Sequence, residues 1–133
     1  MNSPEISVVM AVFNGEEWLE ATLSSVLNQQ ACDFEFLVIN DGSTDGTGYI
    51  LNEWEPRYKH LKVFHQKNIG LTHSLIRGCK IAKGKFIARK DVGDISFPCR
   101  LAKQAALLKA NPSIVLVSCD YSQVTPDGEV LVD

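Results

Sequence analysis

Acidic side chains that could do chemistry gather in two short stretches of the chain, "VINDGSTDGT" (38–47) and "KDVGDIS" (90–96). Asp41 ends an apolar run and is followed at once by a loop rich in glycine and small hydroxyls, and Asp91 and Asp94 lie close together in the second stretch. Carboxylate oxygens bind hard cations and accept hydrogen bonds from N–H and O–H groups. Such residues suit a nucleotide that carries a divalent ion, whereas a phosphate alone would not explain the acids.

Strands and helices alternate along the chain and place both stretches at strand ends. Nearly continuous apolar runs are typical of parallel strands that are covered on both faces, and apolar residues at helical spacing follow each run. Proline and glycine mark the ends of the helices. We expect strands at 6–12, 34–40, 61–65, 85–90 and 113–119, a hairpin at 124–132, and helices that begin at Asn14, at Ser43 or Thr44, near Leu71, and at Ser96 to Pro98.

This alternation predicts one α/β domain over residues 1–133, a three-layer α/β/α sandwich with a mostly parallel sheet. Ligands of such sheets bind at the carboxyl ends of the strands. The loops after residues 12, 40, 65 and 90 should therefore open on one edge and bring the acids together.

Composition excludes several classes of protein. The chain is 45% hydrophobic and 22% charged, with a net charge of −3, so a basic face for nucleic acid is not expected. No apolar run approaches the ~18 residues that span a bilayer, and the first residues lack the basic region of a signal peptide, which predicts a cytoplasmic protein. Cys32, Cys79, Cys99 and Cys119 are far apart in sequence, which favours free thiols over a disulfide or zinc site.

Each candidate residue also has a plain structural interpretation. Asp41 could form only a turn, Asp45 could complement a helix dipole, Asp91 and Asp94 could lie in a solvated turn, and Phe13 could be core. Their common place at strand ends favours a site. The chain does not match a dinucleotide-binding Rossmann domain, because the turn after its first strand, "AVFNGEEW", has one glycine where the fingerprint of that domain needs three.

The segments "ISVVMAVFNGEEWLEATLSSVLNQQ", "FEFLVINDGSTDGT", "NIGLTHSL" and "AKGKFIARKDVGDISFPCRLAKQ" resemble the nucleotide-sugar-binding part of glycosyltransferase family 2, a family with the GT-A fold. The resemblance spans about residues 5–120. It implies a loop after the second strand that holds the base of a nucleotide, usually uridine.

The resemblance also implies roles for individual residues. Ala11 and Phe13 would surround the base, Asp41 would accept a hydrogen bond from it, and Gly70 with Leu71 would lie along the nucleotide. Asp91 matches the first acid of the family's DxD element, near the ribose and the diphosphate, and Asp94 matches the acid that follows that element. Asp91 and Asp94 are then the candidate ligands of a divalent cation, Mn²⁺ or Mg²⁺.

Three positions depart from the family pattern. Gly93 stands where the family usually has the metal-coordinating acid, so a metal site is weakened, moved onto Asp91 and Asp94, or absent. Asn40 replaces the first of two usual acids, and Ile76 stands where asparagine is common.

The implied activity is inverting transfer of a sugar from a nucleotide-diphosphate sugar to a saccharide acceptor, in cell-surface polysaccharide biosynthesis. No catalytic base is evident in the 133 residues; in the family it lies later, so this fragment alone should be inactive. A nucleotidyltransferase-like enzyme and a non-catalytic nucleotide-binding or assembly module stay open as alternatives. The donor sugar, the acceptor and the oligomeric state are not predicted.

Overall fold

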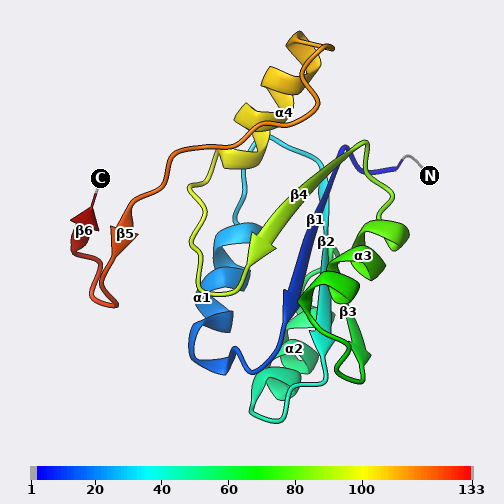
Figure 1. Ribbon diagram of the computed structural model, residues 1–133, viewed down its shortest axis with the longest axis vertical. Helices are drawn as coiled ribbons and strands as arrows, with labels where there is room; N and C mark the ends of the chain where they lie inside the picture. The colour runs from blue at the N-terminus through cyan, green and yellow to red at the C-terminus, as the bar shows by residue number, and fades with distance from the viewer. Residues whose placement is uncertain (1–2, 133) are drawn as a thin grey trace.

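The computed structural model describes residues 3–132, and four parallel strands form its centre (Figure 1). The strand order is β3-β2-β1-β4, and every neighbouring pair in this sheet is parallel. The elements are β1 (Ile6–Val12), α1 (Glu16–Leu27), β2 (Phe34–Asp41), α2 (Thr47–Trp54), the short 3₁₀ helix η1 (Glu55–Arg57), β3 (Leu61–Gln66), α3 (Leu71–Ile81), β4 (Phe86–Asp91), α4 (Arg100–Ala110), β5 (Gln123–Val124) and β6 (Val130–Val132). The predicted α/β architecture is confirmed.

The two central strands are buried along their whole length. Every residue of β1 and β2 is buried, as expected of strands that are covered on both faces. On one face, Val8, Met10 and Phe36 pack with residues of α1, α2 and α4 in a single hydrophobic cluster. Helix α3 covers the other face, which gives the predicted three layers (Figure 1).

Helix α3 lies very close to the sheet because its buried residues are small. They are Ser74 and Gly78, and a Cβ atom added at Gly78 would lie 2.3 Å from Cγ1 of Val9. The apolar side chains whose spacing predicts the helix are not its buried face: Leu71 and Cys79 are exposed. A stripe of small residues therefore sets the distance between α3 and the sheet.

The fifth predicted strand is wrong. Residues 113–119 lie outside every helix and strand of the described chain, and Val115 and Leu116 are 94% and 83% exposed. A strand needs a neighbour with which to share its hydrogen bonds. Among residues 3–132, β4 pairs with β1 alone, so 113–119 meets no partner there.

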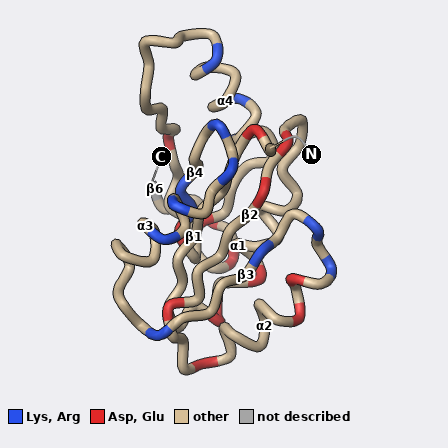
Figure 2. The backbone as a smooth tube through the Cα atoms, turned by 90° about the vertical axis from the view of Figure 1, so that its right-hand side faces the viewer, with Lys and Arg blue, Asp and Glu red and all other residues tan. Residues whose placement is uncertain are grey.

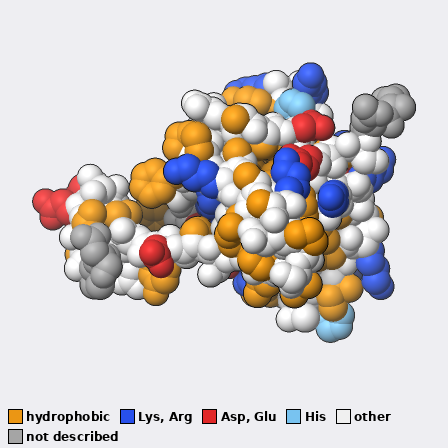
Figure 3. Space-filling model, turned by 90° about the horizontal axis from the view of Figure 1, so that it is seen from above, with side chains coloured by type: hydrophobic (Ala, Val, Ile, Leu, Met, Phe, Trp, Pro, Cys, Tyr) orange, Lys and Arg blue, Asp and Glu red, His pale blue; other side chains and the backbone are white. Residues whose placement is uncertain are grey.

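The predicted hairpin is present as β5 and β6, an antiparallel pair that forms a sheet of its own. Its turn is closed by a hydrogen bond from the Gly128 N–H to the Thr125 carbonyl, 2.9 Å. In Figures 1 and 3 this hairpin projects to one side of the domain.

Helix α3 begins at Leu71 as predicted, but α1, α2 and α4 begin later than the sequence predicts. Helix α1 begins at Glu16 rather than at Asn14, whose φ of 52° is left-handed, and α2 begins at Thr47 rather than after a Ser43 or Thr44 cap. Helix α4 begins at Arg100. The polar residues expected to cap helices instead join the loops to each other, as described below. No helix within residues 3–132 is long and apolar enough to cross a membrane.

Candidate functional site

The predicted site residues lie at the carboxyl edge of the sheet, on the face that α3 covers. Ala11 pairs in register with Asp91 on β4 and with Ile39 on β2, and Asp41 lies two residues beyond Ile39. Side chains two apart on a strand share a face, so Ala11, Asp41 and Asp91 all face α3. From strand spacing and rise, the Cα atoms of Asp41 and Asp91 are about 12 Å apart. An elongated ligand could contact both, whereas one ion could not.

Asp41 is 2% exposed, and its carboxylate holds the loop that leads into α3. Oδ1 accepts hydrogen bonds from the Gln66 amide and the Ile69 N–H, both 2.8 Å, and Oδ2 accepts from the Gly70 N–H, 2.9 Å. Burial acts to raise the pKa of Asp41, but the hydrogen bonds from Gln66, Ile69, Ser74 and Gly70 together lower it. Asp41 is therefore an ionised anchor at the edge of the sheet.

Gln66 orients Asp41. Its amide NH₂ donates to Asp41 and to the Ser74 hydroxyl, both at 2.8 Å, and its amide oxygen accepts from the Arg77 guanidinium at 2.6 Å. Arg77 only donates and an ionised carboxylate only accepts, so the amide can lie in one orientation alone. The sequence analysis missed Gln66 and Arg77, since neither belongs to a recognisable motif.

The loops after β1 and β2 are joined by hydrogen bonds between residues about 30 apart in sequence. The Asn14 N–H donates to Ser43 Oγ, 3.0 Å, and the Asn14 amide oxygen accepts from the Thr44 N–H, 2.7 Å. The Gly15 N–H donates to Thr47 Oγ1, 2.9 Å. Much of the polar character of the "DGSTDGT" loop therefore serves to hold the first loop in place.

Asp45 strengthens this junction. Its carboxylate accepts from the Thr47 N–H at 3.0 Å and from the Glu16 N–H at 3.3 Å, and the Glu16 carboxylate in turn accepts from the Gly46 N–H. Burial acts to raise the pKa of Asp45, but hydrogen bonds from Thr47 and Glu16 lower it. Asp45 therefore bonds to the first residue of α2, and its role toward the helix dipole stays a prediction.

Asn40 belongs to a second polar chain on the same side. Its amide oxygen accepts from the Ser43 N–H, 3.2 Å, so its NH₂ faces His65 Nδ1 at 3.0 Å. Nδ1 must then be the unprotonated nitrogen, and His65 Nε2–H donates to the Asn52 side chain at 2.9 Å. An aspartate at position 40 could not donate to a neutral His65.

On the other side of the site, Asp91 is paired with Arg89. Arg89 Nε and Nη2 lie 3.1 Å from the two carboxylate oxygens, a bidentate pair that is about half exposed. Asp94 follows Gly93, whose φ is +99°, and is exposed. Loop 91–94 is tied down by the Gly93 N–H, which donates to Thr22 Oγ1 at 2.9 Å.

Lys90 is buried directly beside these acids but on the opposite face of β4, at 2% exposure. Its Nζ donates to Ser96 Oγ at 2.9 Å and so fastens the segment after β4 to the sheet. Burial, and then the charge of Arg100, lower the pKa of Lys90 to about 8, while the Asp94 and Asp91 carboxylates oppose the shift. At pH 7 the ammonium form still predominates.

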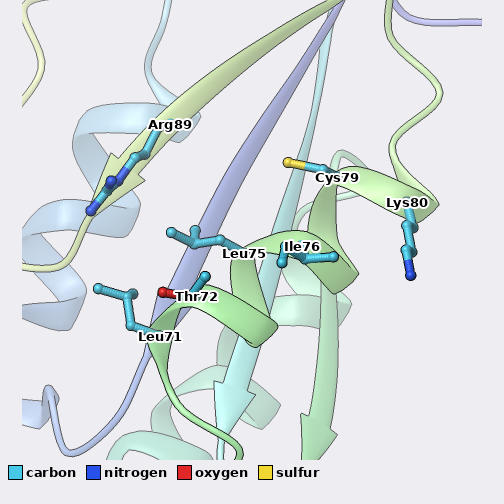
Figure 4. Close-up of a pocket in the computed structure, with 7 residues that line it drawn as sticks. All are labelled: Leu71, Thr72, Leu75, Ile76, Cys79, Lys80 and Arg89. Carbon is cyan, nitrogen blue, oxygen red and sulfur yellow. The ribbon is translucent and has the colours of Figure 1, made fainter.

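A groove of about 460 Å³ lies between α3 and β4 (Figure 4). Leu71, Leu75 and Ile76 line it from α3 and Arg89 lines it from β4. The Arg89 guanidinium therefore lies at an apolar wall and beside Asp91, the acid that it pairs with. Over the chain as a whole, Lys and Arg are interspersed with Asp and Glu (Figure 2).

A cation was predicted at Asp91 and Asp94, and the donor set fits one poorly. Gly93 offers no side-chain oxygen, and both Asp91 oxygens already accept from a guanidinium. Within residues 3–132 no group of three His, Cys, Asp or Glu side chains could hold a metal ion. The roles of Ala11, Phe13, Asp41, Gly70, Asp91 and Asp94 toward a ligand stay predictions.

The family model described as Glycosyl transferase family 2 matches residues 7–132. An uncharacterized glycosyltransferase of Haemophilus influenzae is 37% identical over 129 residues, which cover 96% of this chain and 40% of that protein. A cholesterol galactosyltransferase of Borreliella burgdorferi is 36% identical over 90 residues, which cover 68% of this chain and 25% of that protein. The chain thus spans less than half the length of these relatives.

Solved structures share the fold. The structure of S. aureus TarS 1-349 in complex with UDP-GlcNAc has a TM-score of 0.74 and 27% identity, over 81% of this chain and 32% of that chain. The mannosyltransferase PcManGT from Pyrobaculum calidifontis, in complex with GDP-Man and Mn²⁺, has a TM-score of 0.75 and 23% identity, over 85% of this chain and 34% of that chain. Both place the sheet and its helices in the GT-A class.

Proposed function

The chain belongs to glycosyl transferase family 2, and we propose that it binds the nucleotide-diphosphate sugar, a UDP-sugar, of an inverting transfer to a saccharide acceptor. The observation that carries this proposal is the shared edge: Ala11, Asp41 and Asp91 face α3 at the carboxyl ends of three adjacent strands. TarS, whose structure holds UDP-GlcNAc, supports a uridine nucleotide.

The Asp41 side would hold the base and the Asp91 side the ribose and diphosphate. Gln66, Ile69, Ser74 and Gly70 all act on the Asp41 carboxylate through hydrogen bonds, so a base N–H would share the carboxylate with them or take the place of one of them. Phe13 is 51% exposed at the end of β1 and presents a ring on which a base could stack. Gly70 would run along the nucleotide.

The catalytic base would lie outside these 133 residues, in the remainder of a longer cytoplasmic enzyme of cell-surface polysaccharide biosynthesis. An inverting transfer needs a carboxylate within reach of the acceptor hydroxyl. Here Asp41 and Asp45 are engaged by main-chain N–H groups and Asp91 by Arg89. The fragment would bind donor without turning it over.

Calorimetric titration of UDP, GDP and dTDP into the chain tests the proposal, with Asp41→Ala as the comparison. We expect UDP to bind the wild-type chain and to bind Asp41→Ala at least tenfold more weakly. Failure of all three nucleotides to bind, with or without Mn²⁺, would overturn the proposal, and the chain would then share the family's fold without a donor site.

A further inference from the structure

The Asp91 side of the site carries positive charges where a cation-binding loop would present free acids. Asp91 accepts both hydrogen bonds of the Arg89 fork, and Gly93 leaves the next position without a ligand. Of the two acids in loop 91–94, Asp91 is in a salt bridge and Asp94 is in none of those found among residues 3–132. A divalent ion at Asp91 would have to displace the guanidinium or lie beside it, and like charges at that distance repel.

Lys90 adds a second positive charge beneath the same loop. It is buried between β4 and the segment that leads to α4, where its only described partner is the uncharged Ser96 hydroxyl. Burying an ammonium without a bonded carboxylate is unfavourable. Its charge acts through the protein, where salt screens it far less than at the surface.

Arg100 makes this region more positive still. It lies close enough to Lys90 for their charges to interact, and its Nε is buried without a hydrogen-bond partner. The charge of Arg89 acts on Asp91 directly, and Lys90 interacts with Asp91, Asp94 and Arg100, so three cations lie near a loop whose acids are Asp91 and Asp94. The balance favours an incoming anion over an incoming cation.

We propose that this site binds its nucleoside diphosphate without a divalent cation, the guanidinium of Arg89 and the ammonium of Lys90 supplying the positive charge. This inference rests on the proposed function, because it concerns the diphosphate of the same ligand. Arg89 is exposed at the edge of the α3–β4 groove and can turn from Asp91 to a phosphate, a planar bidentate partner of the same kind (Figure 4). Lys90 stays in place and contributes through its field.

The test is calorimetric titration of UDP and of uridine into the chain, in EDTA and again in Mn²⁺. We expect the Kd for UDP in EDTA to lie within about threefold of that in Mn²⁺. Arg89→Gln and Lys90→Met should each weaken UDP about tenfold in EDTA and change the Kd for uridine less than twofold, since uridine carries no phosphate. A variant that merely loosened the fold would weaken both ligands alike.

Arg57→Gln is the matched control. Arg57 is as exposed as Arg89 and pairs with Glu53 at 3.0 Å, but it lies in η1, away from the loop after β4. It should change neither Kd. Arg89→Gln keeps the test decisive if Lys90→Met fails to fold, because Arg89 is exposed.

The outcomes separate the two proposals. UDP binding that disappears in EDTA and returns with Mn²⁺ would overturn the metal-free site and leave the donor-binding function standing. Unchanged UDP binding in Arg89→Gln and Lys90→Met would overturn the assignment of the charges. Absence of nucleotide binding under every condition would overturn both proposals.

Restoring the acid gives the converse experiment. A Cβ at position 93 meets no atom within 4 Å, so Gly93→Asp has space, although its φ of +99° strains a non-glycine residue. Combined with Arg89→Gln, it should make UDP binding at least threefold tighter in Mn²⁺ than in EDTA. No response to Mn²⁺ would overturn the view that Gly93 and Arg89 are what keep a cation out.

Discussion

The two sides of the site are built in different ways. On the Asp41 side, three loops are joined by direct hydrogen bonds among Asn14, Thr44, Asp41 and Gly70. On the Asp91 side, loop 91–96 is held by the bonds of Gly93 to Thr22 and of Lys90 to Ser96, and charge dominates. The first side is preorganised by hydrogen bonds, and we propose that the second binds through the charges of Arg89 and Lys90. Mutations on the first side should therefore alter stability and binding together, and mutations on the second should alter binding alone.

Asp41→Ala should have the largest effect. It leaves the N–H groups of Ile69 and Gly70 and the Gln66 amide without their acceptor, and orphaned polar groups of this kind cost about 1–3 kcal/mol each when buried. We expect the free energy of unfolding in urea to fall by about 3 kcal/mol. Asp41→Asn, which keeps the shape and one acceptor, should lose less; equal losses would show that the charge and its bonds are not the anchor.

Gln66→Leu should come next. It removes the donor to Asp41 and the acceptor of Arg77 while keeping most of the volume, so we expect a loss of about 2 kcal/mol. The pKa of Asp41 should also rise, because one of the bonds that lower it is gone. NMR titration of the Asp41 carboxyl measures this; an unmoved pKa would mean that Gln66 does not orient Asp41.

Asn14→Ala and Asn14→Gly separate two contributions at one residue. Both lose the side-chain bonds to Thr44, but only alanine also strains the left-handed backbone at φ 52°. We expect losses of about 2 kcal/mol for alanine and about 1 kcal/mol for glycine in urea unfolding. If glycine were the worse of the two, backbone strain would not be the reason for asparagine here.

Asp45→Asn should change how the stability of the fold depends on pH below neutrality. The folded-state pKa of Asp45 is lowered, so its contribution is fully present above about pH 4 and is lost as the pH falls through the folded value. The wild-type chain should therefore lose stability below about pH 4 more steeply than Asp45→Asn. Thermal unfolding from pH 2 to pH 7 measures the difference; parallel curves would contradict it.

Lys90→Met should change stability least. Replacing a buried charge by an apolar side chain of similar size is often neutral or stabilising, so we expect a change within about 1 kcal/mol of wild type. A loss above 2 kcal/mol in urea unfolding would show that Lys90 is a structural clamp through Ser96, and the contrast between the two sides of the site would fail.

Local patterns were enough to predict the sheet and the acids at its edge. The runs 6–12 and 34–40 are mostly apolar, and a buried parallel strand is what such runs form. The run 113–119 looks the same in sequence, yet it is no strand here, because pairing depends on a neighbour that no local pattern reveals. The same limit hid the bonds between Asn14 and Thr44, and the role of Gln66, which needs Arg77 and Asp41 on other elements.

The exposed segment 113–119 also gives the molecule an internal reference for hydrogen exchange. Apart from the Ile114 N–H, which donates to the Asn111 carbonyl at 2.9 Å, its amides should exchange at nearly the rate of an unfolded peptide, because they belong to no helix or strand of the described chain. Those of β1 and β2 should exchange only on global unfolding. A nucleotide bound at the sheet edge would slow exchange in loops 13–16 and 66–70 and leave 113–119 as fast as before. One exchange experiment would then report both nucleotide binding, from the protected loops, and the rate of unprotected exchange, from segment 113–119.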